Sequence, residues 1–416
     1  MRALLAILLV LLPYLLPGIR VGSVPIPTMF LFCGLYLVAF HPRIPPEYFK
    51  AFLIVLGYML LFCLRNSLLP SGGAREFLYL LMIFGHLSIF VAFYDLFQRG
   101  YGELILRLSI VFAVFEVLVM LAQSMDFGGI NQSLAPLFLY YLGIANAEDF
   151  LLVISSRPFG TMSTSILAGM SAYLAMRAVA VYTGKRAYVY LALPAILLSA
   201  SRMALVMFIF YEFVIPFLLR SGRLRSLLIL AVLGGVLAGV IAVFGDSLMN
   251  LYAFQFAQEV GEGKLGESFS LINRLNSYVW AYEKLDQFLL FGGVTTDEFS
   301  ARPFAVDSEI VLRSLQFGLI GYLLMIWLNF IIVEKSKCYD SYFILFFMFI
   351  ASITNTVASN FLFMPFVAIY VCALRIATDK RRLQQAISWH LSSQSTPHWR
   401  AGSLPPPSPP IFGQTR

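Results

Sequence analysis

The chain has 416 residues, of which 60% are hydrophobic and only 12% are charged, and its mean hydropathy is +0.82. A soluble protein of this length would carry about twice that charged fraction, which argues against an ordinary soluble fold. The net charge of +7 does not indicate nucleic-acid binding, because Lys and Arg stand in short segments between apolar runs and form no basic stripe. We therefore expect an all-α, polytopic integral membrane protein.

About twelve apolar runs of roughly the length that crosses a bilayer follow one another along the chain. We expect membrane-spanning helices at 3–18, 24–40, 50–68, 77–97, 104–123, 161–182, 187–200, 202–219, 226–244, 309–333, 341–357 and 360–376. No small-residue cleavage site follows the first run cleanly, so we expect a retained span and not a removed signal peptide. Residues 1–383 are thus predicted to form one transmembrane bundle.

The distribution of Lys and Arg predicts the orientation of the bundle. With the N-terminus in the cytoplasm, nineteen of the 29 Lys and Arg residues fall on the cytoplasmic side and ten on the outer side. Both termini are therefore expected in the cytoplasm.

Two segments on the outer side are long, at about 124–160 and 245–308, the second of them just before the tenth predicted span. Within 245–308, apolar residues recur at mostly three- and four-residue intervals: Leu271, Leu275, Val279, Tyr282 and Leu289. This spacing predicts an amphipathic helix on the bundle or at the membrane surface. Residues 384–416 end in the Pro- and Ser-rich stretch SLPPPSPPIFGQTR and are predicted to be a disordered cytoplasmic tail.

Eight of the ten cations on the outer side are arginines, whose planar guanidinium binds two phosphate oxygens at once. An arginine at membrane depth is costly unless it faces a partner or an aqueous cavity. Several stand at the mouths of predicted spans: Arg75, Arg157, Arg202 and Arg313. As a set they predict a site for an anionic ligand, whereas any one of them could instead reach the interface or pair with Glu298, Asp307 or Glu309.

The other titratable residues limit which side chains could act as a base or bind a metal. On the outer side, Asp307 and Glu309 flank Ser308 at the start of the tenth span, and either carboxylate could accept a proton. Three of the four histidines fall on the cytoplasmic side and His86 lies inside a span, so no outer histidine is expected as a base or metal ligand. The four cysteines lack metal-ligand spacing and are predicted to be buried, and neither a metal nor a cofactor is expected.

Four stretches in chain order resemble the successive landmarks of bacterial O-antigen polymerases and O-antigen ligases. They are RPFGTMSTSILAGMSAYLAM (157–176), LLSASRMALVMFIF (197–210), NRLNSYVWAYEKLDQFLLFGGVTTDEF (273–299) and VDSEIVLRSLQFGLIGYLLMI (306–326). They supply an Arg-x-x-Gly before one helix, a Ser-Arg pair opening another, a loop with Arg, Trp and a Leu-Phe-Gly turn, and a Gly-Leu-Ile-Gly helix. The resemblance covers about 157–330.

Members of this family act on the periplasmic face of the inner membrane, with an undecaprenyl-diphosphate-linked saccharide as donor and with no nucleotide sugar or metal. The resemblance implies that Arg202 and Arg274 hold the diphosphate. It leaves the base open, because Asp307 or Glu309 could accept the proton, or neither could. The weaker candidates for the diphosphate are Arg157, Arg75, Arg302 and Arg313. Clustered arginines suit this task because they stabilise the growing charge of the leaving group.

The ligase branch typically carries a histidine in the closing motif of the loop, but here that motif reads Val306-Asp307-Ser308-Glu309. The difference favours a polymerase, which joins lipid-linked repeat units. A ligase that transfers glycan to lipid A–core or protein is the first alternative. A flippase or transporter is the second, although the halves of the chain show no internal repeat. A structural partner of a synthesis complex also stays open.

The partners implied by the resemblance are a lipid-linked oligosaccharide donor and acceptor and the lipid bilayer, with a chain-length regulator left open and no nucleic acid expected. The implied location is the bacterial inner membrane, crossed several times.

Overall fold

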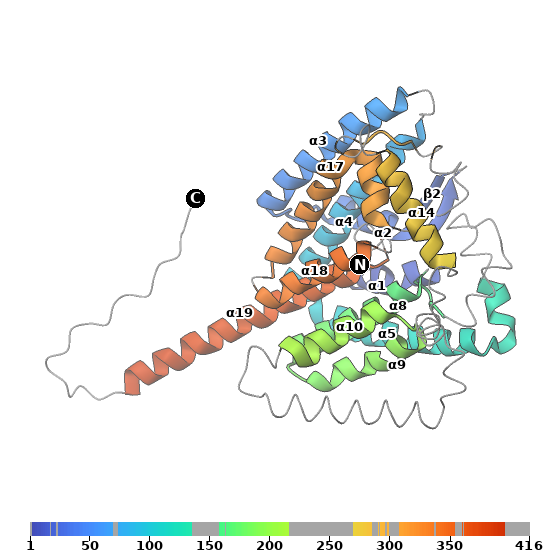
Figure 1. The fold of residues 1–416 in the computed structure, drawn as a ribbon. Coiled ribbons are helices and arrows are strands. Elements are labelled where there is room, and N and C mark those ends of the chain that lie inside the picture. Colours follow the sequence, from blue (N-terminus) through green and yellow to red (C-terminus); the bar gives the residue numbers. More distant parts are fainter. Residues whose placement is uncertain are drawn as a thin grey trace.

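The computed structural model describes residues 2–16, 18–21, 24–69, 74–134, 158–162, 164–215, 269–284, 290, 292–295, 298, 308–336, 338–353, 360 and 362–395. Within these ranges the chain is mostly helical, and its strands form one short antiparallel hairpin. Figure 1 shows the helices packed into one bundle, from which the second half of α19 extends.

The first part of the chain forms α1 (Arg2–Leu15), β1 (Gly18–Val21), β2 (Val24–Pro27), α2 (Thr28–Phe40), α3 (Pro46–Ser67), η1 (Ala74–Phe77), α4 (Leu78–Gln98), α5 (Gly102–Ser124) and η2 (Phe127–Gly129). The middle forms α8 (Ser165–Thr183), η3 (Arg186–Ala192), α9 (Leu193–Leu198), α10 (Arg202–Ile209) and the π-helical turn η4 (Phe210–Val214). The last part forms α14 (Phe269–Glu283), α17 (Glu309–Glu334), η6 (Tyr339–Ser341), α18 (Tyr342–Ser352) and α19 (Met364–Ser395).

Helical structure occurs at every predicted span that falls within the described residues. The predicted span 226–244 lies outside them, as do most of the predicted long segments 124–160 and 245–308. Among the described helices, α3, α5, α8 and α17 are long and apolar enough to cross a membrane. Other apolar helical runs are shorter in the described part of the chain, among them Ile83–Gln98 and Arg186–Leu198.

Large apolar side chains are exposed in rows along three of these long helices. The rows contain Leu53, Leu60 and Leu64 on α3, Val111, Val114 and Leu118 on α5, and Ile320, Leu323 and Trp327 on α17. Because contiguous apolar surface is unfavourable in water, such rows indicate faces that contact lipid. The apolar helices thus indicate a membrane protein, as the composition predicts.

The hairpin is a correction to the predicted span 24–40, whose first residues form a strand. Strands β1 and β2 pair with Gly18 opposite Pro27 and with Val21 opposite Val24. Pro25 and Pro27 have no N–H for the hydrogen bonds of a helix, so α2 begins only after them.

The start of the predicted disordered tail is also corrected. Helix α19 continues to Ser395, so residues 384–395 are helical, while 396–416 lie outside the described residues. The sequence from Lys380 contains several strong helix formers and no proline before Pro397, which explains why the helix extends so far.

Helix α14 confirms the predicted helix within 245–308 but not its packing face. It contacts α17 through Trp280 and Ala281, which are buried with Val294. Val279 and Tyr282, which belong to the predicted apolar face, are exposed. Since the helix is apolar on two sides, sequence spacing alone did not identify the side that packs.

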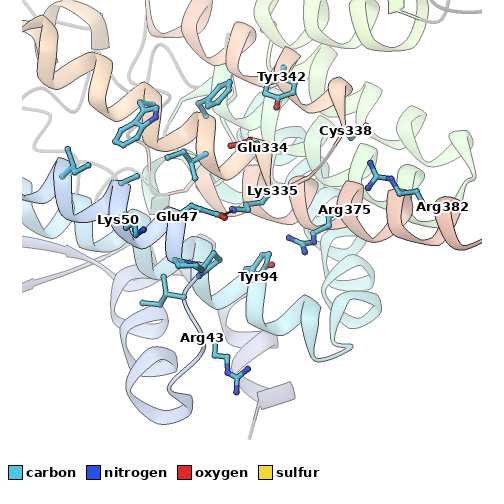
Figure 2. Close-up of a pocket in the computed structure, with 18 residues that line it drawn as sticks. Arg43, Glu47, Lys50, Tyr94, Glu334, Lys335, Cys338, Tyr342, Arg375 and Arg382 are labelled. Atoms are coloured by element: carbon cyan, nitrogen blue, oxygen red, sulfur yellow. Dashed lines mark hydrogen bonds and ion pairs between the residues drawn. The ribbon is translucent and has the colours of Figure 1, made fainter. Parts of the chain in front are cut away.

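One end of the bundle carries a wide groove between the start of α3 and the end of α17 (Figure 2). Residues of α4, α18 and α19 complete its walls. Half-buried Cys338 lies in this groove, and burial raises the pKa of its thiol. The other three cysteines are buried, as predicted, and all four are free.

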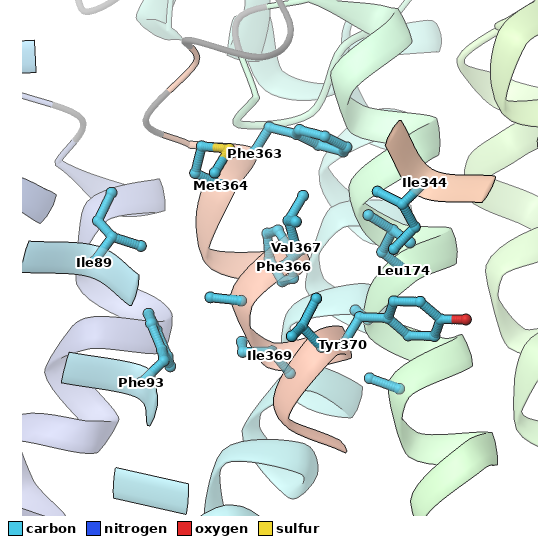
Figure 3. Close-up of a cluster of buried hydrophobic side chains, with 14 of the residues drawn as sticks. Ile89, Phe93, Leu174, Ile344, Phe363, Met364, Phe366, Val367, Ile369 and Tyr370 are labelled. Atoms are coloured by element: carbon cyan, nitrogen blue, oxygen red, sulfur yellow. The ribbon is translucent and has the colours of Figure 1, made fainter. Parts of the chain in front are cut away.

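The centre of the bundle is formed by α8 and the first half of α19. Figure 3 shows Phe366 and Val367 of α19 among Ile89 and Phe93 of α4 on one side and Leu174 of α8 on the other. Helix α8 is buried at nearly every position because its alanines and Gly169 let neighbouring helices approach closely. This centre positions both ends of the bundle.

The segment that enters α8 is fastened to α5 by two buried side chains. The Gln123 amide oxygen accepts hydrogen bonds from the backbone N–H groups of Phe159 (3.1 Å) and Gly160 (2.8 Å), and its NH₂ donates to the Gly160 carbonyl (3.0 Å). The Glu116 carboxylate accepts from the backbone N–H and the hydroxyl of Thr161. The segment belongs to the first of the four landmark stretches, so its place beside α5 is set by buried polar contacts.

Replacing Gly160 should test this attachment. Gly160 has a φ of +60°, and a Cβ there would collide with the Glu116 carboxylate. Gly184, at the other end of α8, has a φ of +72° and open space around it. Both alanine variants carry the left-handed strain, but only Gly160→Ala overpacks, so it should lose about 1–3 kcal/mol more stability. Unfolding of the two variants in detergent measures the difference, and equal losses would contradict the attachment.

Candidate functional site

The site is built around a break in α17. Gly318, inside this helix, has φ 75° and ψ 164°, a backbone conformation that is essentially confined to glycine. The break interrupts the helical hydrogen bonds, so nearby carbonyls accept from other parts of the chain. The Gln316 carbonyl accepts from the Gly293 N–H (3.3 Å) and the Asn66 amide (3.2 Å). The Leu315 carbonyl accepts from the Val294 N–H (3.0 Å), and the Phe317 carbonyl from the Tyr58 hydroxyl (2.9 Å).

The segment 292–295 is thereby docked on the broken helix. Gly292 has a φ of +69°, and a Cβ there would collide with backbone atoms of Gln316 and Gly318. Arg65, at the end of α3, donates from Nη2 to the Gly292 carbonyl (3.2 Å). Helix α3, the segment 292–295 and α17 therefore meet at one place.

The half of α17 before the break carries charged and polar side chains inside the protein. Glu309 is 0% exposed and Arg313 8% exposed, one helical turn apart. The Ser352 hydroxyl donates to Glu309 Oε2 (3.1 Å), and Arg313 Nη1 donates to Gln316 Oε1 (3.0 Å). A buried acid and a buried guanidinium thus stand one turn apart on the same helix in a largely apolar bundle, which makes this place a candidate functional site.

The N-terminus of α17 is fixed by hydroxyl groups. Ser308 caps the helix by accepting from the Val311 N–H (3.4 Å), and its hydroxyl lies 3.3 Å from the Tyr278 hydroxyl of α14. Tyr278 also donates to the Ile353 carbonyl (2.7 Å) at the end of α18. These bonds hold α14 and α18 against the start of α17.

His86 belongs to the same site. It is buried in α4, close enough to Arg313 for their charges to interact. Neither ring nitrogen has a hydrogen-bond partner in the described part of the chain. A neutral imidazole can both donate and accept a hydrogen bond, so this side chain could bind a polar group that enters the site.

The structure places only part of the predicted site. Glu309 and Arg313 lie together on α17. Arg274 is on α14, which packs on α17, and Arg75 is in η1, which contacts α3 and α4. Arg202 begins α10 behind the cap Ser201, and α10 contacts α8, α9 and α18. Three predicted residues lie outside the described residues: Arg157, Arg302 and Asp307.

Sequence reasoning missed four contributors: Arg65, Asn66, His86 and Gln316. The sequence places His86 within a predicted span but does not indicate a part for it in the site. The available signal was a single polar residue inside the apolar run LMIFGHLSIFV, which is a functional candidate by default. The described residues contain no group of three or more His, Cys, Asp or Glu side chains that could hold a metal ion.

Comparisons with protein-family models, with curated proteins and with solved structures gave no match. The class of the protein therefore follows from its fold and its site alone. It is a mostly helical membrane protein with a buried acid, a buried arginine and a broken helix at one end of its bundle.

Replacing Gly292 should test the docking on the broken helix. Gly292→Ala forces a Cβ against the backbone of Gln316 and Gly318, which cannot move cheaply. The amides of Gly293 and Val294 should then exchange hydrogen at least about tenfold faster, equal to roughly 1.4 kcal/mol. Gly100→Ala is the matched control, since Gly100 has a φ of +86° and nothing near its Cβ position. Unchanged exchange in Gly292→Ala, measured by mass spectrometry, would contradict the docking.

Proposed function

We propose that the protein is an integral membrane glycosyltransferase of the O-antigen polymerase type, which joins undecaprenyl-diphosphate-linked repeat units on the periplasmic face of the bacterial inner membrane. The observation that carries the proposal is Arg313 buried beside Glu309 on a broken helix whose carbonyls bind the segment 292–295. The segment 292–295 falls in the stretch 273–299, and Glu309 and Arg313 fall in the stretch 306–326. Both stretches resemble landmarks of this family.

The proposal includes the arrangement of the chain in the membrane. Twelve spans carry both termini to the cytoplasm, and the long segment 245–308 lies on the periplasmic side over the site. Donor and acceptor enter laterally from the bilayer, because both are attached to a lipid. The exposed apolar side of α14, with Val279 and Tyr282, supports this by offering a surface for a lipid chain near the site.

The proposed reaction is a single displacement. An acceptor hydroxyl attacks the anomeric carbon of the donor sugar, forming the new C–O bond while the bond from that carbon to the diphosphate oxygen breaks. The proton of the hydroxyl passes to a carboxylate. We assign it first to Asp307, since Glu309 is fully buried and bonded by Ser352, and Glu309 is the alternative.

The leaving group is undecaprenyl diphosphate, and arginines stabilise its charge. We assign the diphosphate to Arg202 and Arg274, with Arg313, Arg75, Arg157 and Arg302 in support. Guanidinium groups in surroundings of low dielectric constant stabilise such charge strongly without reorganising during the reaction. The burial of Arg313 supports this part of the proposal.

A ligase is the second candidate, and one observation favours it. The closing motif of the loop has no histidine, but His86 of α4 is buried and close enough to Arg313 for their charges to interact. A histidine is thus present at the site even though the motif lacks one. The two functions differ in the acceptor, which is a lipid-linked saccharide for a polymerase and lipid A–core or a protein for a ligase.

Arginine substitutions test the site. Arg202→Ala and Arg274→Ala should reduce polymer roughly 100-fold or more, as does removal of a group that stabilises transition-state charge. Arg313→Lys keeps the charge but loses the planar fork, and should also lower polymer strongly. Polymer is measured on gels from a host lacking its own copy, with insertion followed by a fluorescent tag.

Arg107→Ala is the matched control, because Arg107 is exposed in a pair with Glu103 on α5. It should leave polymer unchanged. Full-length polymer from both Arg202→Ala and Arg274→Ala, with normal insertion, would remove the diphosphate assignment.

A further inference from the structure

The groove at the other end of α17 is large and lies apart from the candidate site. It encloses about 1290 Å³ between the start of α3, the ends of α4 and α17, and residues of α18 and α19. Figure 2 shows the contact between Glu47 and Lys335 in the middle of the lining residues, with Lys50 and Arg382 on opposite sides of it. The proposed reaction uses none of these residues.

The charges that line the groove are mostly positive. Five cations, Arg43, Lys50, Lys335, Arg375 and Arg382, stand against two carboxylates, Glu47 and Glu334. Five against two leaves a surplus of positive charge, which favours an anionic occupant.

The cations differ in how far the protein itself engages them. Lys335 pairs with Glu47, and the Arg375 guanidinium lies 5.3 Å from the centre of the Tyr94 ring and 3.8 Å from Asp379. Arg375 Nε is buried and has no hydrogen-bond partner in the described part of the chain. The remaining three are exposed and form no ion pair with a described carboxylate: Arg43, Lys50 and Arg382.

One wall of the groove is apolar and continues along the bundle. Trp327 and Phe330 of α17 line it and are 38% and 39% exposed. They extend the exposed apolar row that begins at Ile320 and Leu323 on the same helix. Ile54 of α3, 55% exposed, faces the groove from the other side. A ligand in the groove therefore meets cations at one end and lipid-facing apolar surface at the other.

We propose that this groove binds an anionic phospholipid, with its head group against the exposed cations that line the groove and its acyl chains along Trp327 and Phe330. A free phosphate or another small anion would match the cations but would leave the apolar wall unused. Basic pockets between membrane helices are known to suit anionic head groups, and the charge distribution predicts this end to be cytoplasmic. The inference does not depend on the glycosyltransferase proposal.

The test compares two lipids with identical acyl chains. Purified full-length protein in detergent is titrated with phosphatidylglycerol or phosphatidylcholine, and bound lipid is counted by native mass spectrometry. The wild type should prefer phosphatidylglycerol. Lys50→Gln/Arg382→Gln should lower that preference roughly tenfold or more, because each cation near an anionic head group contributes about a fivefold gain.

The control removes two exposed cations outside the groove, Arg107→Gln/Lys185→Gln, and should keep the preference. Thermal unfolding in the same detergent checks that both double variants stay folded. Equal binding of the two lipids, or an unchanged preference in Lys50→Gln/Arg382→Gln, would overturn the proposal. Displacement of phosphatidylglycerol by an equal concentration of inorganic phosphate would also overturn it, since the groove would then be a site for a soluble anion.

Discussion

The break at Gly318 is the constraint on which the site depends. In a membrane, backbone groups without a partner cost several kcal/mol each, so a broken helix requires donors from elsewhere in the protein. Here the carbonyls of Leu315, Gln316 and Phe317 obtain them from Gly293, Val294, Asn66 and Tyr58. Because those donors come from the segment 292–295 and from α3, their hydrogen bonds bring two distant parts of the sequence to the half of α17 that carries Arg313.

A second buried charge pair shows what a structural role looks like in the same bundle. Arg177 on α8 pairs with Glu212 in the π-helical turn, donates from Nε to the Tyr370 hydroxyl of α19 (3.0 Å), and lies 4.2 Å from the centre of the Tyr211 ring. The Tyr173 hydroxyl donates to the same carboxylate (3.0 Å). The partners of Arg177 are side chains of the protein itself, and these contacts hold α8, η4 and α19 against one another. This is a structural role, in which the charges of a buried ion pair are compensated within the protein. Arg313 differs in having His86 and a broken helix next to it, so the two arginines have different surroundings although both are buried.

Sequence reasoning predicted the helical membrane class, the helix within 245–308 and the shared helix of Glu309 and Arg313, because these follow from local composition and spacing. It could not predict the hairpin at 18–27, where two prolines outweighed apolar character, or the extent of α19. The part of the site contributed by Asn66 depends on long-range packing, which no local pattern encodes. Arg157, Arg302 and Asp307 stay predictions.

The most direct measurement of the central claim is glycosyl transfer by the purified protein. The protein is placed in nanodiscs with the lipid-linked repeat unit of its host, in EDTA and without nucleotide sugar, and the products are separated on a gel. A polymerase should give a ladder whose steps equal one repeat unit, with release of undecaprenyl diphosphate. An unchanged substrate, followed by a single transfer once lipid A–core is added, would contradict the polymerase and establish a ligase. An unchanged substrate under both conditions would contradict the glycosyltransferase altogether.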